Sequence, residues 1–184
     1  MRVLRNIPNY LTIFRILITP IIVLTFYFEG AALSHILGSI LFIFAGISDF
    51  LDGYIAKKFN LISNFGQMLD PVADKVLISC VIVMLIKTDK VNVIAGLLIL
   101  SREFIVSGLR EFLGQVQVSM PVSRLSKLKT IVQMCSLSLL ILGSQASGIR
   151  IIDPIGNASL WVAVILTIIT GSSYIKSCKA LWKN

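Results

Sequence analysis

Four aspartates lie within one stretch of the chain, and their spacing favours metal chemistry. Residues 46–75 read GISDFLDGYIAKKFNLISNFGQMLDPVADK and hold four of the nine acidic residues. Asp49 and Asp52 are three residues apart, and Asp70 and Asp74 are four apart, so each pair occupies one face of a helix. Clustered carboxylates near lipid repel one another unless cations balance them. Hard oxygen ligands suit Mg²⁺ or Mn²⁺, and four carboxylates can hold two such ions, an arrangement suited to phosphoryl transfer.

The elements that must position these aspartates are predicted to be two antiparallel helices. The loop between them is short, so the helices should be neighbours and the two carboxylate pairs should converge. Gly53, Ala56 and Gly66 lie beside the aspartates and leave bare backbone that a bulky substrate can approach. Asp70 before Pro71 also fits a helix N-cap. That explanation accounts for one aspartate and not for the cluster, and acids in membrane segments usually have a function.

The rest of the chain is too apolar for an ordinary soluble domain. Of 184 residues, 56% are hydrophobic and 14% are charged, and the mean hydropathy is +0.89. We therefore predict a single all-α integral membrane domain over residues 1–184, a bundle of six transmembrane helices. A short N-terminal interfacial helix, stopped by Pro8, is expected before the first span. The predicted spans are Tyr10–Phe28, Ala31–Lys57, Asp70–Ile86, Val91–Phe112, Leu125–Leu142 and Ile155–Leu181.

Basic residues are distributed unevenly between the two ends of these helices. Fourteen of the 17 lysines and arginines fall on the side that holds both termini, and Lys87, Lys90 and Arg150 fall on the other. Basic residues accumulate on the cytoplasmic side of membrane proteins, so both termini and the aspartates should be cytoplasmic. The net charge of +8 suits anionic lipids or an anionic substrate. No aromatic and basic surface in the sequence suggests nucleic-acid binding.

The aspartate stretch resembles the signature of the CDP-alcohol phosphotransferase family. That signature is D-x-x-D-G-x-x-A-R, eight spacer residues, and then G-x-x-x-D-x-x-x-D. The matching residues here are Asp49, Asp52, Gly53, Ala56, Lys57, Gly66, Asp70 and Asp74. Lys57 stands where the family usually has arginine, and it keeps the charge without the bidentate fork. Three further segments are similar to the bacterial branch that makes phosphatidylglycerophosphate: NIPNYLTIFRI near the start, SREFIVSGLRE at Ser101–Glu111 and LSKLKT at Leu125–Thr130.

The resemblance implies an enzyme that transfers a phosphatidyl group from CDP-diacylglycerol to glycerol 3-phosphate and releases CMP. It also implies a homodimer of six-helix protomers in the bacterial inner membrane, with a site open to the cytosol. Asp49, Asp52 and Asp70 would bind one Mg²⁺ or Mn²⁺ ion. Asp74 would help to bind a second ion and act as the catalytic general base. The residues expected to contact the CDP-lipid are Asn9, Thr12, Gly53, Ala56, Lys57, Ser63 and Gly66.

Basic residues around the fourth predicted loop are candidates to bind the phosphate of the acceptor. They are Arg102, Arg110, Lys127 and Lys129. Topology alone is the alternative explanation, because basic residues gather at inner helix ends. Glu103 and Glu111 are expected to orient the arginines. Arg15, about a turn inside the first span, requires an acidic or phosphate partner, and Tyr174 is interpreted as an interface anchor or lipid-facing residue.

Other acceptors and other classes of protein stay open at this point. Within the family, phosphatidylglycerol, serine or an inositol phosphate are alternative acceptors, although the basic residues favour a phosphorylated one. Intramembrane prenyltransferases also use aspartates and metal ions for diphosphates, but they usually show two separated motifs in a longer bundle. A cation transporter would place its acids at mid-membrane rather than near the helix ends.

Overall fold

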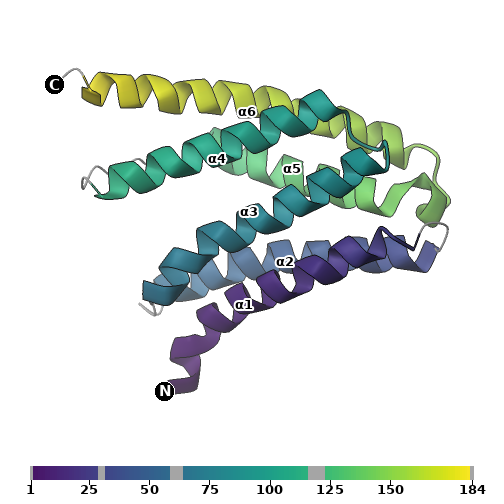
Figure 1. Cartoon of the computed structure of the whole chain (residues 1–184), viewed down its shortest axis with the longest axis horizontal. Coiled ribbons are helices and arrows are strands. Elements are labelled where there is room, and N and C mark those ends of the chain that lie inside the picture. Colours follow the sequence, from purple (N-terminus) through teal and green to yellow (C-terminus); the bar gives the residue numbers. More distant parts are fainter. Residues whose placement is uncertain (1, 29–31, 59–63, 116–122, 183–184) are drawn as a thin grey trace.

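The computed structural model describes residues 2–28, 32–58, 64–115 and 123–182, which form six helices and no strand (Figure 1). Both ends of the chain lie at one end of the bundle, here called the terminal end (Figure 1). The same end holds the last turns of α2 and α4 and the first turns of α3 and α5. The helices are α1 (Arg2–Thr25), α2 (Ala32–Lys58), α3 (Asn64–Lys87), α4 (Val93–Gln115), α5 (Arg124–Ser147) and α6 (Ile152–Trp182).

Three of the described helices are long and apolar enough to cross a membrane. The stretches are Ala32–Leu51 in α2, Arg124–Ser147 in α5 and Ile152–Ser172 in α6, and Asn9–Thr25 in α1 is a shorter apolar stretch. Large apolar side chains such as those of Leu17 and Leu33 are more than 60% exposed. A surface of this kind is suited to lipid rather than to water. These features identify a helical membrane protein.

Helix α1 packs against both α2 and α3, whereas α5 packs against α2 and α6. The core between them includes Ile22 of α1, Phe42 of α2, Leu85 of α3 and Leu137 of α5, all completely buried.

We predicted that α2 and α3 would be direct neighbours. Among the described residues they instead have sparse mutual contacts, and both lie against α1. Ile18 and Ile22 of α1 and Phe26, just after the helix ends, recur every four residues and form the apolar stripe that this packing requires. Side chains of α1 can therefore reach residues of both helices.

Two predicted helix boundaries are wrong, and each involves a proline. Helix α1 runs from Arg2 through Pro8, so the interfacial helix is not a separate element. A proline removes one backbone hydrogen bond and can bend a helix without ending it, and Figure 1 shows the N-terminal end of α1 turned away from the rest. Helix α3 begins at Asn64, so Pro71 lies inside it and Asp70 is not its N-cap.

Helix α5 is interrupted at Gly143, next to Leu142, where the sequence predicts its end. The φ of 67° and ψ of 166° at Gly143 lie outside the helical region and are accessible to glycine. In an unbroken helix the amide of Ser144 would donate to the carbonyl of Leu140. Instead Ser144 N donates to Asp153 Oδ2 at 3.1 Å, and Lys90 Nζ donates to Leu140 O at 3.1 Å. Two side chains from outside α5 thus satisfy both halves of the broken hydrogen bond.

Candidate active site

Aspartates of α2 and α3 meet around a buried arginine of α1. The side chain of Arg15 is 1% exposed, forms an ion pair with Asp49, and places Nη2 3.8 Å from Asp70 Oδ1. The hydroxyl of Thr12 donates to the Asp70 carboxylate, and the hydroxyl of Thr19 donates to the carbonyl of Arg15 at 2.8 Å. Spacings of three and four residues put these α1 side chains on one face. The partner that the sequence requires for Arg15 is therefore acidic, and α1 links the carboxylates of two other helices.

Asp49 and Asp74 lie where two cavities meet. One cavity, of about 680 Å³, is lined mainly by apolar residues of α2 and α5 such as Ile43 and Met134, and is here called the apolar cavity. The other, of about 640 Å³, is lined by charged and polar residues of α4 and α5 and is here called the charged cavity. Both linings include Asp49 and Asp74. The two carboxylates therefore face a space for hydrocarbon and a space for a charged group.

Three of the four basic residues predicted to bind the acceptor line the charged cavity. Arg102 and Arg110 come from α4, and Lys127 comes from α5. Lys129 has a different position, because its side chain is 1% exposed and its ammonium binds the Glu103 carboxylate. Two residues along a helix correspond to a rotation of about 200°, so Lys127 and Lys129 face opposite directions. Glu103 Oε2 also lies 3.7 Å from Arg102 Nη1. The sequence analysis predicts that Glu103 orients this arginine.

Helix α6 supplies hydroxyl groups to both arginines of the charged cavity. Arg102 Nη2 donates to Thr170 Oγ1 at 3.1 Å, and Arg110 Nη2 donates to the hydroxyl of Tyr174 at 3.0 Å. Tyr174 is 8% exposed, so its interpretation as a lipid-facing or interface residue is wrong. Sequence reasoning missed Thr170 as well. The available signal was two hydroxyl side chains, Thr170 and Tyr174, four residues apart and hence on one face of the helix.

Several predicted site residues lie outside the side chains that the structure describes. Ser63 is outside the described residues, and side-chain positions are not described for Asp52, Gly53, Ala56, Lys57 and Gly66. Asn9 is partly buried in α1, one turn before Thr12. Among the described side chains, no group of three or more His, Cys, Asp and Glu residues is arranged to hold a metal ion. Metal binding by the four aspartates therefore stays a prediction.

Comparison with known proteins places the chain in one family. The family model for CDP-alcohol phosphatidyltransferases matches residues 5–169. The chain is 59% identical over 179 residues to a Rickettsia felis protein named CDP-diacylglycerol--glycerol-3-phosphate 3-phosphatidyltransferase, with 97% of this chain and 98% of the relative aligned. A Bacillus subtilis protein with the same name is 36% identical over 188 residues, covering 96% of this chain and 97% of the relative. The chain therefore belongs to the CDP-alcohol phosphatidyltransferase family, as the aspartate signature predicted, and is an enzyme of that family.

Proposed function

We propose that this enzyme transfers the phosphatidyl group of CDP-diacylglycerol to glycerol 3-phosphate, giving phosphatidylglycerophosphate and CMP. The observation that carries the proposal is the meeting of the apolar cavity and the charged cavity at Asp49 and Asp74. A lipid donor needs hydrocarbon space beside the reacting phosphorus, and a phosphorylated acceptor needs cations on the other side. The names of the Rickettsia and Bacillus relatives describe the same reaction.

The apolar cavity is suited to an acyl chain of the donor. It lies between α2 and α5, and residues such as Ile43, Ile131, Leu139 and Leu142 line it. An acyl chain that enters from the membrane interior would be held by van der Waals packing, because lipid tails are as apolar as this lining. The cytidine diphosphate head would then lie near the helix ends, in contact with Asn9, Thr12, Gly53, Ala56, Lys57, Ser63 and Gly66.

Asp49, Asp52, Asp70 and Asp74 would hold two divalent ions, Mg²⁺ or Mn²⁺. The donor set fits, because carboxylates of α2 and α3 already gather around the positive charge of Arg15 and are the hard ligands that these ions prefer. When bound, the ions would neutralise charge on the diphosphate and on the departing CMP. The side chains themselves would keep the diphosphate in one orientation at the junction of the two cavities.

Asp74 is suited to act as the general base of the transfer. It lines the charged cavity together with Arg102, Arg110 and Lys127, which would bind the acceptor phosphate through charge-assisted hydrogen bonds. The carboxylate of Asp74 would accept the proton of the primary hydroxyl of glycerol 3-phosphate. That oxygen would form a bond to the lipid-linked phosphorus as the bond from this phosphorus to the CMP oxygen breaks. The ammonium group of Lys129 forms an ion pair with Glu103. Lys129 would therefore fix the position of Glu103 rather than bind the acceptor phosphate.

The same proposal includes six transmembrane helices in the bacterial inner membrane, with both termini and the site on the cytoplasmic side. It also includes a homodimer. Three described helices have the length and apolarity of spans, and the apolar stretch Asn9–Thr25 of α1 is shorter than these. Helices α3 and α4 carry charged residues of the site, such as Asp74 and Arg102, and charged residues lower the mean hydropathy of a helix. Labelling of lysines on intact cells with a membrane-impermeant, amine-reactive reagent tests the orientation of the protein in the membrane. Modification of Lys87 without Lys127 is expected, and the opposite pattern would contradict it.

The acceptor assay tests the function. Purified protein would receive CDP-diacylglycerol, Mg²⁺ and one acceptor at a time, and CMP release would be measured. Release with glycerol 3-phosphate, and much less with inositol phosphate, phosphatidylglycerol or serine, is expected. Release with inositol phosphate alone would assign another acceptor within the family. No release with any acceptor would contradict the proposed function, and metal flux in liposomes or prenyl transfer would then be measured.

A further inference from the structure

Two arginines with like charges are held over one buried aromatic ring between α4 and α6. The centre of the Arg110 guanidinium lies 5.6 Å from the Tyr174 ring centroid, and that of Arg102 lies 5.9 Å away. Distances within about 6 Å allow a cation to interact with the face of the ring. The ring thus holds both cations close to the wall of the charged cavity, which both of them line.

The contacts of Arg102 with α6 depend on two consecutive residues. Its Nη2 donates to Thr170 Oγ1 at 3.1 Å. A Cβ atom at Gly171 would lie 3.1 Å from Arg102 Cγ, closer than most real contacts of this kind, so the glycine lets the stem of the arginine lie against α6. Arg102 is therefore fixed at its stem and at one guanidinium nitrogen, while its side chain stays part of the cavity wall.

The groups that orient these arginines leave their charge available. Threonine and tyrosine hydroxyls accept hydrogen bonds without neutralising a guanidinium, unlike a carboxylate. Among the described residues, Glu103 is the carboxylate within 4.0 Å of Arg102, and it is shared with Lys129. No carboxylate of the described residues lies within that distance of Arg110. Two nearby guanidinium groups with so little counter-charge favour a dianionic ligand, which a phosphomonoester provides.

We propose that Thr170, Gly171 and Tyr174, the α6 seat, are positioning residues that aim Arg102 and Arg110 at the acceptor phosphate and so set selectivity for a phosphorylated acceptor. This inference rests on the proposed function and adds residues of α6 to it. The α6 seat should not touch the donor, because its members contact the arginines and lie outside both cavity linings. Its effect should therefore be confined to the acceptor.

Removal of single hydroxyl groups tests the α6 seat. Tyr174→Phe keeps the ring and Thr170→Val keeps the shape, but each removes the acceptor of one guanidinium hydrogen bond. Loss of one such bond should raise KM for glycerol 3-phosphate roughly two- to tenfold. Both kcat and KM for CDP-diacylglycerol should change less than twofold, because the contact is made equally in the ground and transition states. Gly171→Ala should also raise KM for glycerol 3-phosphate, since its new Cβ displaces Arg102.

Matched controls are available in the same chain. Thr167→Val makes the same change one turn earlier on α6, where the buried hydroxyl has no hydrogen-bond partner in the described structure. Tyr27→Phe makes the same change as Tyr174→Phe, but at the end of the bundle opposite the terminal end. Tyr27 is exposed, and its ring contacts Lys87. Both controls should leave KM for glycerol 3-phosphate within twofold of the wild type.

A binding measurement separates failure of this inference from failure of the proposed function. Thermal unfolding of the detergent-solubilised protein would be followed with and without excess glycerol 3-phosphate. Glycerol 3-phosphate should raise the Tm of the wild type and raise it less in Tyr174→Phe and Thr170→Val, whose Tm values without ligand should match the controls. An equal Tm increase in all variants, with unchanged KM, would overturn the α6 seat even if the enzyme makes phosphatidylglycerophosphate. Loss of kcat and basal Tm without a change in KM would assign these residues a structural role and overturn it as well.

Discussion

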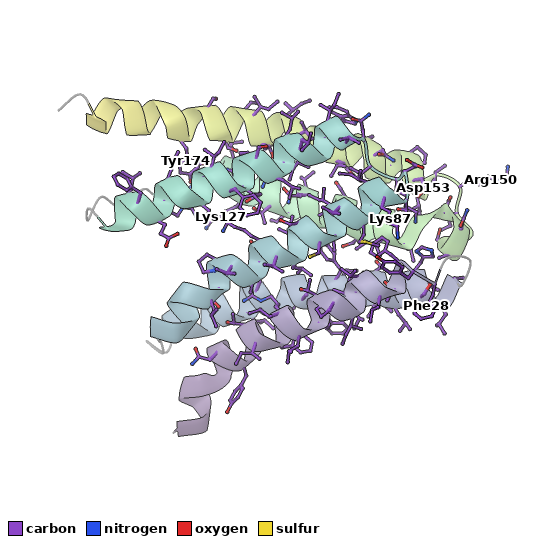
Figure 2. The ribbon with its side chains drawn as sticks, in the orientation of Figure 1. Phe28, Lys87, Lys127, Arg150, Asp153 and Tyr174 are labelled. Carbon is purple, nitrogen blue, oxygen red and sulfur yellow. The ribbon has the colours of Figure 1, made fainter. Side chains whose placement is uncertain are left out.

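At the terminal end of the bundle, half-buried and exposed charges line a cavity, whereas at the opposite end half-buried charges bind backbone atoms. Figure 2 shows Lys127 and Tyr174 toward the terminal end and Lys87 and Asp153 toward the other. At that other end Lys90 donates to the Leu140 carbonyl, and Asp153 accepts from Ser144. Neither Lys90 nor Asp153 lines the apolar or the charged cavity.

The difference between the ends shows that partial burial of a charge does not by itself indicate a function. Lys90 and Asp153 repair a break in α5, so their partners are supplied by the fold. Burial lowers the pKa of Lys90 below its usual value, and the charge of Asp153 acts in the opposite direction. At the terminal end, Asp49, Asp74 and the α4 arginines face open space that a substrate can fill. The open cavity, rather than the charge, distinguishes a candidate catalytic group from a structural one.

The largest effect is expected from matched aspartate substitutions at the two ends. Asp74→Asn should lower kcat by about 10²–10⁴-fold, the usual contribution of a general base, with limited loss of donor binding. Asp153→Asn makes the same chemical change but should leave kcat within twofold while lowering Tm. CMP release and thermal unfolding of both variants are the measurements. Normal turnover in Asp74→Asn would remove Asp74 as the base.

Metal dependence should also be confined to the terminal end. EDTA should abolish CMP release and Mg²⁺ should restore it. Mg²⁺ at a hundredfold excess over its Kd should stabilise the wild type by about 2–3 kcal/mol, measured as an increase in Tm. Asp49→Asn should lose this stabilisation, whereas Asp153→Asn should keep it. An equal response of both variants to Mg²⁺ would place the ion outside the aspartate cluster.

A substitution at the break in α5 should affect stability without affecting substrate binding. Gly143→Ala forces a side chain into a backbone conformation that costs about 1–3 kcal/mol, and its Cβ would lie 2.6 Å from Lys90 Nζ. Urea or thermal unfolding should show this loss, with KM for glycerol 3-phosphate unchanged. Gly114→Ala in α4 is the control, because its Cβ would meet open space and the helix should be slightly stabilised. Equal stability of the two variants would argue against the repaired break.

The smallest effect is expected from exposed lysines at the two ends. Lys127→Ala should raise KM for glycerol 3-phosphate roughly two- to tenfold, because an exposed charge contributes modestly. Lys87→Ala removes a lysine that contacts the Tyr27 ring at the opposite end and should leave that KM unchanged. A salt titration of KM should show a shallower dependence in Lys127→Ala only. Equal KM values would remove Lys127 from the acceptor site.

Much of the fold was predictable, because the apolar runs are long and repeat at helical spacing. The second predicted span, Ala31–Lys57, differs by one residue at each end from α2. Prolines caused the main errors, since Pro8 and Pro71 both lie within helices that continue past them. Hydropathy gives no information on which side of a helix faces a neighbour, and Tyr174 and Lys129 were misplaced for that reason.

The sequence by itself determined the family and the six long helices, and it predicts metal chemistry at the aspartate signature. These follow from residue types at fixed spacings along one chain, which local geometry converts directly into shared helix faces. Only the tertiary structure decided that α1 joins α2 to α3 through Arg15, and that α6 orients the α4 arginines. Those contacts join residues 34 to 68 positions apart. No local pattern specifies such contacts, because they depend on how the apolar stripes of all six described helices pack together.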